Sequence, residues 1–229
     1  MRTQDHYQFG ESRRLPYLKY ARGSYSGRCS LSRTSSDLLA VGSAQRKPGR
    51  CSRPRSLERM GEPAPTWSIG HSNHELPAFV DLVRGAGIAV IADVRSQPYS
   101  RFNPQFNREP LRSSLLESGI DYVFLGAELG GRPAEPECYD SDGNVLYGKV
   151  AQTDRFRDGL QRLVSGSQRF RVAMMCSEGD PANCHRHLLI ARALTEDGAP
   201  VVHVLSDGTT ITETELAAQH ASQPALFGD

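Results

Sequence analysis

The segment from residue 176 to residue 186 concentrates side chains that could carry out catalysis. It reads Cys176-Ser-Glu178-Gly-Asp-Pro-Ala-Asn-Cys184-His185-Arg186 and combines two thiols, a carboxylate, an imidazole and a guanidinium. Cys176 ends an apolar run, whereas Cys184 is expected in the first turn of a helix, whose amino end favours a thiolate. The alternative for Cys184 is a buried thiol that only packs in the core.

Three chemistries are compatible with this segment. In the first, Cys176 is a nucleophile whose proton passes to His71 or His185, and Glu178 acts as an acid or base. In the second, both cysteines and a histidine bind zinc. The cysteines are eight positions apart instead of following the short spacer of common zinc sites, so we expect no metal. In the third, Glu178 and Asp93 form a carboxylate pair and the cysteines only pack.

Polar residues also follow two other apolar runs. His71 and Ser72 follow the first run, and Asp93 and Arg95 end the second. An unpaired carboxylate at the end of a buried strand is costly, so Asp93 needs a partner. Because Arg95 points to the same side of an extended chain, the simpler interpretation is an Asp93–Arg95 ion pair. The functional interpretation is that Asp93 orients His71 or Arg95, while Arg95 holds an anion.

The loop over residues 97–107 is dense in amide, guanidinium and aromatic groups. Arg101 suits a phosphate or carboxylate because its planar fork forms two parallel hydrogen bonds. Phe102 could stack on a planar ligand, although aromatic rings that close the edge of the core are the alternative. We assign catalysis to His71, Asp93, Cys176 and Glu178. We assign substrate binding to Ser72, Arg95, Arg101, Phe102, Asn103, Gln105, Gly130, Gly131, Cys184, His185 and Arg186.

Apolar runs and amphipathic segments alternate along the chain, which indicates βαβ units and a parallel sheet. We expect strands at 67–70, 89–94, 121–125, 170–175 and 201–205, and a long loop at 130–148. Helices are expected at 75–84, 108–118, from 153 to about 164, at 181–197 and at 212–219. The predicted fold class is α/β, with a single open, mostly parallel sheet of about five strands and helices on both faces, a three-layer Rossmann-like arrangement. Right-handed crossovers then bring the strand-to-helix loops together at one edge of the sheet.

Charge divides the chain into unlike parts. Residues 1–60 carry 13 Lys and Arg against 4 Asp and Glu, whereas residues 61–229 carry 14 against 22. The first part lacks an apolar period, so we expect a disordered extension that precedes a native start at Met60, with a transit segment or a basic nucleic-acid arm as alternatives. We expect the α/β domain at 64–206 and a tail with a short helix at 207–229.

Composition also narrows the class of protein. No apolar run approaches the ~20 residues that cross a bilayer, and five scattered cysteines do not suggest a secreted disulfide framework. We therefore expect a cytoplasmic protein without a membrane partner. The sequence assigns neither a cofactor nor an oligomeric state.

Several short motifs in one order resemble the domain of unknown function 488 family. They are Gly70-His-Ser, Asp93-Val-Arg, the stretch from Ser100 to Asn107, Leu129-Gly-Gly, and Cys176-Ser-Glu with Cys184-His-Arg. The resemblance runs from about residue 67 to residue 205. It implies a compact α/β domain and a polar cleft built from these positions, and it implies no reaction.

The residues favour an enzyme, with a hydrolase or transferase preferred, that acts on an anionic substrate in a cleft at the carboxyl edge of the sheet. Three arginines and the aromatic loop suggest a phosphorylated or nucleotide-like molecule. A nucleic-acid binding or processing module is the first alternative. A thiol redox or metal-binding protein is the second.

Overall fold

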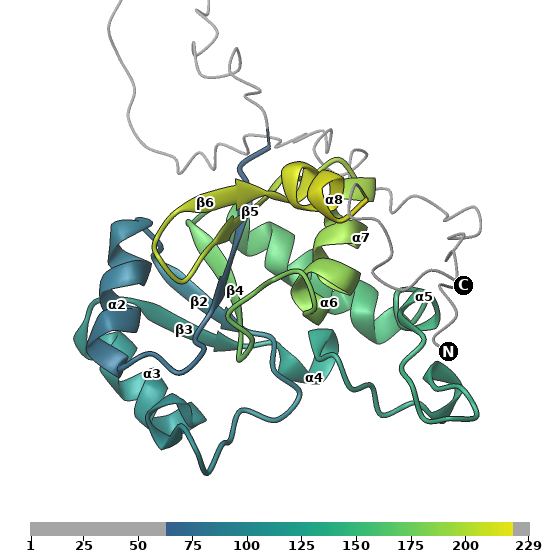
Figure 1. Ribbon diagram of the computed structural model, residues 1–229, viewed down its shortest axis with the longest axis horizontal. Helices are drawn as coiled ribbons and strands as arrows, with labels where there is room; N and C mark the ends of the chain where they lie inside the picture. The colour runs from purple at the N-terminus through teal and green to yellow at the C-terminus, as the bar shows by residue number, and fades with distance from the viewer. Residues whose placement is uncertain (1–62, 222–229) are drawn as a thin grey trace, which may run out of the picture. The chain divides into compact units, whose positions relative to one another are not determined.

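The computed structural model describes residues 63–221, whose centre is a six-stranded sheet (Figure 1). Five strands are parallel: β1 (Thr66–Gly70), β2 (Val90–Asp93), β3 (Asp121–Phe124), β4 (Val172–Cys176) and β5 (Val201–Val204). The sixth, β6 (Thr210–Thr212), is antiparallel to β5, and the order is β3-β2-β4-β1-β5-β6. The α/β class is confirmed. The sequence did not predict β6, because three residues are too few to show an alternating pattern.

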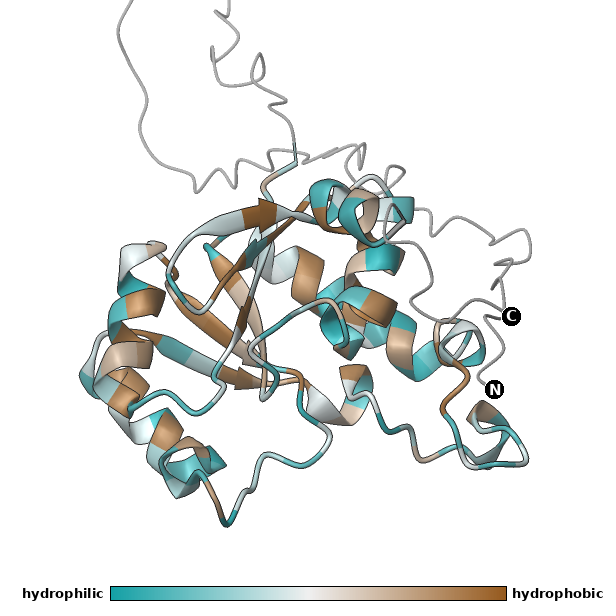
Figure 2. Ribbon diagram, in the orientation of Figure 1, coloured by the Kyte–Doolittle hydropathy of each residue, from teal (hydrophilic) through white to brown (hydrophobic). Residues whose placement is uncertain are grey.

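Helices cover both faces of this sheet. On one face, α2 (Leu76–Gly85) and α3 (Arg108–Glu117) pack with Phe79, Leu111 and their neighbours in one apolar cluster. On the other face lie α6 (Asp154–Ser167), the π-helix η4 (Arg186–Ala191) and α7 (Arg192–Glu196). Apolar residues concentrate on the strands and on the helix sides that face them (Figure 2). The three-layer arrangement therefore follows from two cores, one on each side of the strands.

The remaining helical elements within residues 63–221 complete the description. They are η2 (Pro104–Phe106), α4 (Gly126–Leu129), η3 (Pro136–Cys138), α5 (Tyr147–Val150) and α8 (Glu213–Ala221). The glycines of the Leu129-Gly-Gly motif thus follow the short helix α4, and the long loop expected at 130–148 contains η3. None of the helices within residues 63–221 is both long and apolar enough to cross a membrane. The expectations for residues 1–60, including a start at Met60, lie outside the described residues.

The helix expected from Pro181 begins later than the sequence suggests. Residues 181–184 form turns, in which the Asp180 carboxylate accepts the Ala182 N–H at 2.9 Å. The π-helix η4 begins at Arg186. The Arg186 side chain reaches back to the Glu178 carbonyl, which holds this segment against the sheet before the regular helix starts. Short π-helical stretches often occur at functional sites.

The connections after β1 and β4 leave the sheet in opposite directions. β1 is followed by α2 on one face, whereas β4 is followed by η4 and α7 on the other. These two strands are neighbours in the sheet. Divergence of neighbouring connections opens a crevice at the carboxyl ends of the strands, which is where open α/β sheets bind ligands.

Candidate functional site

The carboxyl ends of β1, β2 and β4 lie side by side. The His71 N–H donates to the Cys176 carbonyl at 2.9 Å, so the loops after β1 and β4 continue the pairing of the strands. The Val94 N–H donates to the Met175 carbonyl at 3.1 Å, which joins β2 to the same strand. The structure therefore brings together the three loops that the crossover rule predicted would meet.

Two adjoining cavities open at this edge, with volumes of about 430 and 400 Å³. They share five lining residues: Arg95, Gln97, Tyr99, Ser177 and Glu178. The first cavity is completed by His71, Ser72, Asn73, Ser100, Asn103 and Gly179. The second is completed by Ser96, Gly131, Arg132, Tyr147, Cys176, Asn183, Cys184 and His185. Polar lining groups of both charges suit a small polar molecule better than an apolar one.

Asp93 and Arg95 form the buried ion pair that the simpler interpretation predicted. Arg95 donates from Nε to Oδ1 at 2.9 Å and from Nη2 to Oδ2 at 2.6 Å. The Tyr122 hydroxyl donates to Oδ2 as well, at 2.7 Å. Asp93 is fully buried and its oxygens are occupied, so it can hold Arg95 in place but is poorly situated to pair with Glu178 as an acid or base.

His71 is the other partner of Arg95. Its Nδ1–H donates to the Ser72 carbonyl at 2.8 Å, and its Nε2 accepts from Nη1 of Arg95 at 3.2 Å. Burial and the neighbouring guanidinium lower the pKa of His71 to about 4. The ring also stacks on Phe106, with 4.2 Å between centroids. With its lone pair directed at Arg95, His71 orients that side chain and is not placed to take a proton from Cys176.

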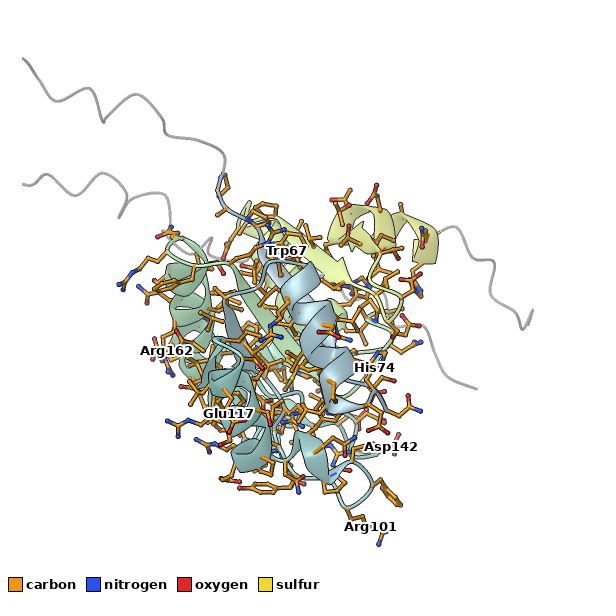
Figure 3. All side chains as sticks on the ribbon, turned by 90° about the vertical axis from the view of Figure 1, so that its left-hand side faces the viewer. Trp67, His74, Arg101, Glu117, Asp142 and Arg162 are labelled. Atoms are coloured by element: carbon orange, nitrogen blue, oxygen red, sulfur yellow. The ribbon has the colours of Figure 1, made fainter. Side chains whose placement is uncertain are left out.

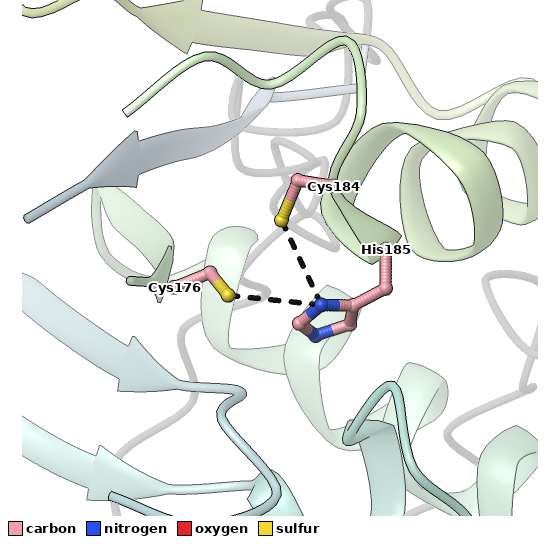
Figure 4. A group of neighbouring side chains, drawn as sticks. All are labelled: Cys176, Cys184 and His185. Carbon is pink, nitrogen blue, oxygen red and sulfur yellow. Dashed lines mark hydrogen bonds between the residues drawn. The ribbon is translucent and has the colours of Figure 1, made fainter. Parts of the chain in front are cut away.

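The second cavity contains a cluster of two thiols and an imidazole (Figure 4). Nδ1 of His185 lies 3.7 Å from Cys176 Sγ and 3.7 Å from Cys184 Sγ. Nε2 of the same ring is 3.0 Å from the Val94 carbonyl, and because a carbonyl only accepts, Nε2 carries the proton. The Nδ1 lone pair therefore faces both sulfur atoms. Such a nitrogen can accept a thiol proton, or it can bind a metal ion together with the thiolates.

The two thiols of this cluster differ in acidity. The hydrogen bond from Cys184 lowers the pKa of Cys176, as does His185 once its Nδ1 has accepted a thiol proton, and burial opposes both effects. The pKa of Cys184 is raised, because its proton is held by Cys176 and because the thiol is buried. The two thiols therefore titrate as a coupled pair that shares one negative charge.

Arg186 contacts the cluster from its buried side and lines neither cavity. It is fully buried, and it donates to the Ser68 hydroxyl at 3.0 Å, to the Glu178 carbonyl at 2.5 Å and to Cys184 Sγ at 3.4 Å. Within residues 63–221 no ion pair involves Arg186. Arg186 was expected to bind substrate; in the structure its guanidinium is buried and holds the loop after β4.

Several glycines are required by close approaches at this edge, among them Gly70 and Gly131. A Cβ on Gly70 would lie 1.8 Å from the Glu178 carbonyl oxygen, and a Cβ on Gly131 would lie 2.9 Å from Cγ of His185. Gly131 was expected to bind substrate. It lines the second cavity, but its clearest role is to leave room for the imidazole.

The comparison with known protein families agrees with the short motifs described above, from Gly70-His-Ser to Cys184-His-Arg. The family model described as domain of unknown function DUF488 matches residues 75–193. The chain belongs to this family. The match covers Asp93, Arg95 and the segment from Cys176 to Arg186, and it begins after His71. No curated protein and no solved structure matches the chain. Membership of the DUF488 family confirms the resemblance drawn from the motifs and names no reaction.

Several residues assigned to the DUF488 cleft lie outside both cavities. Arg101 projects at the tip of the loop over residues 97–107 (Figure 3), with its guanidinium 4.6 Å from the Phe102 ring centroid. Phe102 is 75% exposed. Gln105 donates to the His74 carbonyl at 3.2 Å. In that loop, Asn103 is the one assigned residue that reaches a cavity wall. Gly130 packs against Ser96. Arg101, Phe102, Gln105 and Gly130 were assigned from their residue types, and they line neither cavity.

The sequence assignment also missed residues that line the cavities. Ser177 and Arg132 adjoin assigned residues in the chain, and this adjacency was the available signal. Tyr147 lies in α5, far from any motif, and nothing in its local sequence pointed to the site. The other lining residues without an assignment are Asn73, Ser96, Gln97, Tyr99, Ser100, Gly179 and Asn183.

Proposed function

We propose that this DUF488 protein is an enzyme, a hydrolase or transferase, that acts on a small anionic molecule of the phosphorylated or nucleotide-like class. The observation that carries the proposal is the shared wall of the two cavities. A molecule that spans them meets the guanidinium of Arg95 and the cluster of Cys176, Cys184 and His185 at once. One end of the molecule can thus be bound while the other is exposed to reactive groups.

Arg132 and Arg95 provide the positive charge for an anionic group. Asp93 neutralises much of the charge of Arg95, but it also fixes the orientation of the guanidinium, whereas Arg132 is exposed at the second cavity. Planar guanidinium groups bind phosphate and carboxylate through pairs of hydrogen bonds. Glu178, on the shared wall, limits the charge that the site tolerates and favours ligands with neutral donor groups beside the anion.

A thermal-shift screen of phosphorylated metabolites and nucleotides tests this proposal on the full chain. A ligand of the site should stabilise wild type and bind Arg132→Ala about tenfold to a hundredfold more weakly, because a hydrogen bond between charged groups contributes ~1.5–3 kcal/mol. Arg169→Ala is the matched control, since Arg169 precedes β4 at the opposite edge of the sheet. A screen without any ligand that distinguishes these two variants would count against the proposal.

A second candidate function is the processing of single-stranded nucleic acid. It is favoured by the loop over residues 97–107, which exposes the Phe102 ring beside Arg101 next to the first cavity. Exposed rings stack on unpaired bases, and a guanidinium adds charge. Binding of a labelled single strand should fall in Phe102→Ala but not in Phe170→Ala, whose ring has a similar arginine, Arg169, at the other edge. Equal binding by both variants removes this candidate.

A further inference from the structure

The three donor atoms of the cluster have the spacing of a metal site. The two sulfur atoms and Nδ1 of His185 all lie within 4.8 Å of one another. Zinc binds sulfur at about 2.3 Å and nitrogen at about 2.0–2.1 Å, so sulfur and nitrogen ligands of a tetrahedral ion lie about 3.6 Å apart. The observed separations of 3.7 Å from Nδ1 to Cys176 and to Cys184 require almost no movement. The spacing along the chain, which argued against a metal, is overcome by the turn at residues 181–184.

The surroundings of the donor atoms are those of metal ligands. A histidine that binds zinc usually donates its second N–H to a carbonyl or carboxylate, and His185 donates Nε2–H to the Val94 carbonyl. A thiolate ligand is stabilised by N–H donors, and Nε of Arg186 donates to Cys184 Sγ. These contacts orient both ligands before any ion arrives.

The charges of the site also balance around a divalent cation. Two thiolates offset the double charge of a zinc ion. The buried Arg186 adds one positive charge that no carboxylate within residues 63–221 neutralises through an ion pair. The carboxylate of Glu178 lines the same cavity and supplies one negative charge. Arg132 also lines this cavity, but its side chain is exposed and solvent screens its charge. The sum of the other charges is close to zero, which lowers the cost of burying the ion.

We propose that Cys176, Cys184 and His185 bind one zinc ion, with the fourth coordination position open to the second cavity. Three protein ligands and an open position are typical of catalytic zinc sites, whereas structural sites have four protein ligands. A water at the open position shares the cavity with Glu178, which can accept its proton. A carboxylate that follows a zinc ligand by two residues and is not itself a ligand has this task in zinc-dependent deaminases.

The use of the ion on a substrate rests on the proposed function, but the ion itself can be tested without a substrate. Reduced full-length protein, stripped with a chelator, is titrated with zinc and with cobalt(II). We expect one ion per chain and, with cobalt, a charge-transfer absorption from thiolate ligands. Cys176→Ser, Cys184→Ser and His185→Gln should each lose stoichiometric binding. Cys138→Ser, which alters a buried cysteine outside the cluster, and Glu178→Gln should retain it.

Alkylation mapped by mass spectrometry keeps the test decisive if a variant fails to fold. In wild type, zinc should protect Cys176 and Cys184 and leave the modification of Cys138 unchanged. Protection confined to Cys29, Cys51 or Cys138 would overturn the proposal, as would the absence of stoichiometric binding by reduced wild type. In that last outcome a rapidly alkylated Cys176 would identify the thiol as the reactive group, and the proposed function would stand with a different chemistry.

The open fourth coordination position can be tested separately from the binding of the ion. Azide or inorganic phosphate should alter the visible spectrum of the cobalt-substituted protein, because an added anion enters the fourth position. An unchanged spectrum at saturating anion would show a closed site and overturn the catalytic form of the proposal. Arg132→Ala should bind cobalt as wild type does, so loss of anion binding in the thermal-shift screen and loss of the metal are distinguishable failures.

Discussion

The imidazole of His185 donates to the backbone carbonyl of Val94 over 3.0 Å, although 91 positions separate the two residues in the chain. This bond joins the segment that precedes η4 to the end of β2. It fixes which ring nitrogen carries the proton and turns the other toward the thiols. The chemistry of Cys176 and Cys184 therefore depends on a contact with a different strand.

Gly131→Ala should disturb this histidine. A Cβ at position 131 would come within 2.9 Å of the His185 ring, so the ring must shift and we expect a loss of stability of about 1–3 kcal/mol. Zinc affinity should fall by about tenfold or more. Urea unfolding and metal titration measure the two effects. Gly166→Ala is the control: its Cβ would make an ordinary 3.5 Å contact inside α6, and alanine there should be neutral or stabilising.

Asp93→Asn should be strongly destabilising. The substitution leaves the buried Arg95 without its carboxylate, and breaking a buried ion pair from one side costs about 3–5 kcal/mol. Tyr122→Phe removes only the hydrogen bond to the same carboxylate, for which we expect about 1 kcal/mol. Chemical denaturation of both variants provides the comparison. Similar losses in the two variants would contradict the dominant role assigned to the ion pair.

His71 should make stability depend on pH. Its pKa is about 4 in the folded protein against about 6.5 when unfolded, so the unfolded chain binds the extra proton first as the pH falls. The free energy of unfolding is therefore unaffected by protonation of His71 above pH 6.5. Between about pH 6.5 and 4 it falls, by up to ~1.4 kcal/mol per pH unit. His71→Gln should flatten this part of the curve. Unfolding free energies measured from pH 7 to 4.5 test it, and parallel curves for the two proteins would refute it.

Glu213→Gln should loosen the last elements of the described chain. The buried Glu213 carboxylate contacts Nδ1 of His187 at 2.8 Å and Nε2 of His203 at 2.9 Å, which ties α8 to η4 and β5. Loss of its charge should cost about 2–3 kcal/mol and increase hydrogen exchange in α8. Glu215→Gln, on the exposed side of the same helix, should have a much smaller effect. Equal exchange in both variants would show that the buried carboxylate does not hold the helix.

Much of the fold could be predicted from the sequence, because the patterns that indicate strands and helices are local in the chain. β2 and β4 are apolar on both faces and are buried along their whole length, as central strands must be. Thr153 caps α6 through the Phe156 N–H, which is the contact that its position before an apolar period indicates. β6 and the π-helix were missed, since a three-residue strand and a widened turn leave no periodic pattern to detect.

The candidate site, too, could be predicted from the sequence only in part. Residue types and the crossover rule were enough to indicate that His71, Arg95 and Cys176 meet at one edge of a parallel sheet. The sequence alone could not show that Arg186 turns inward, that Arg101 points away, or that Cys184 and His185 approach Cys176 closely enough to share a proton or an ion. Those outcomes depend on side-chain directions and on packing between segments far apart in the chain. Only the tertiary structure determines such distances.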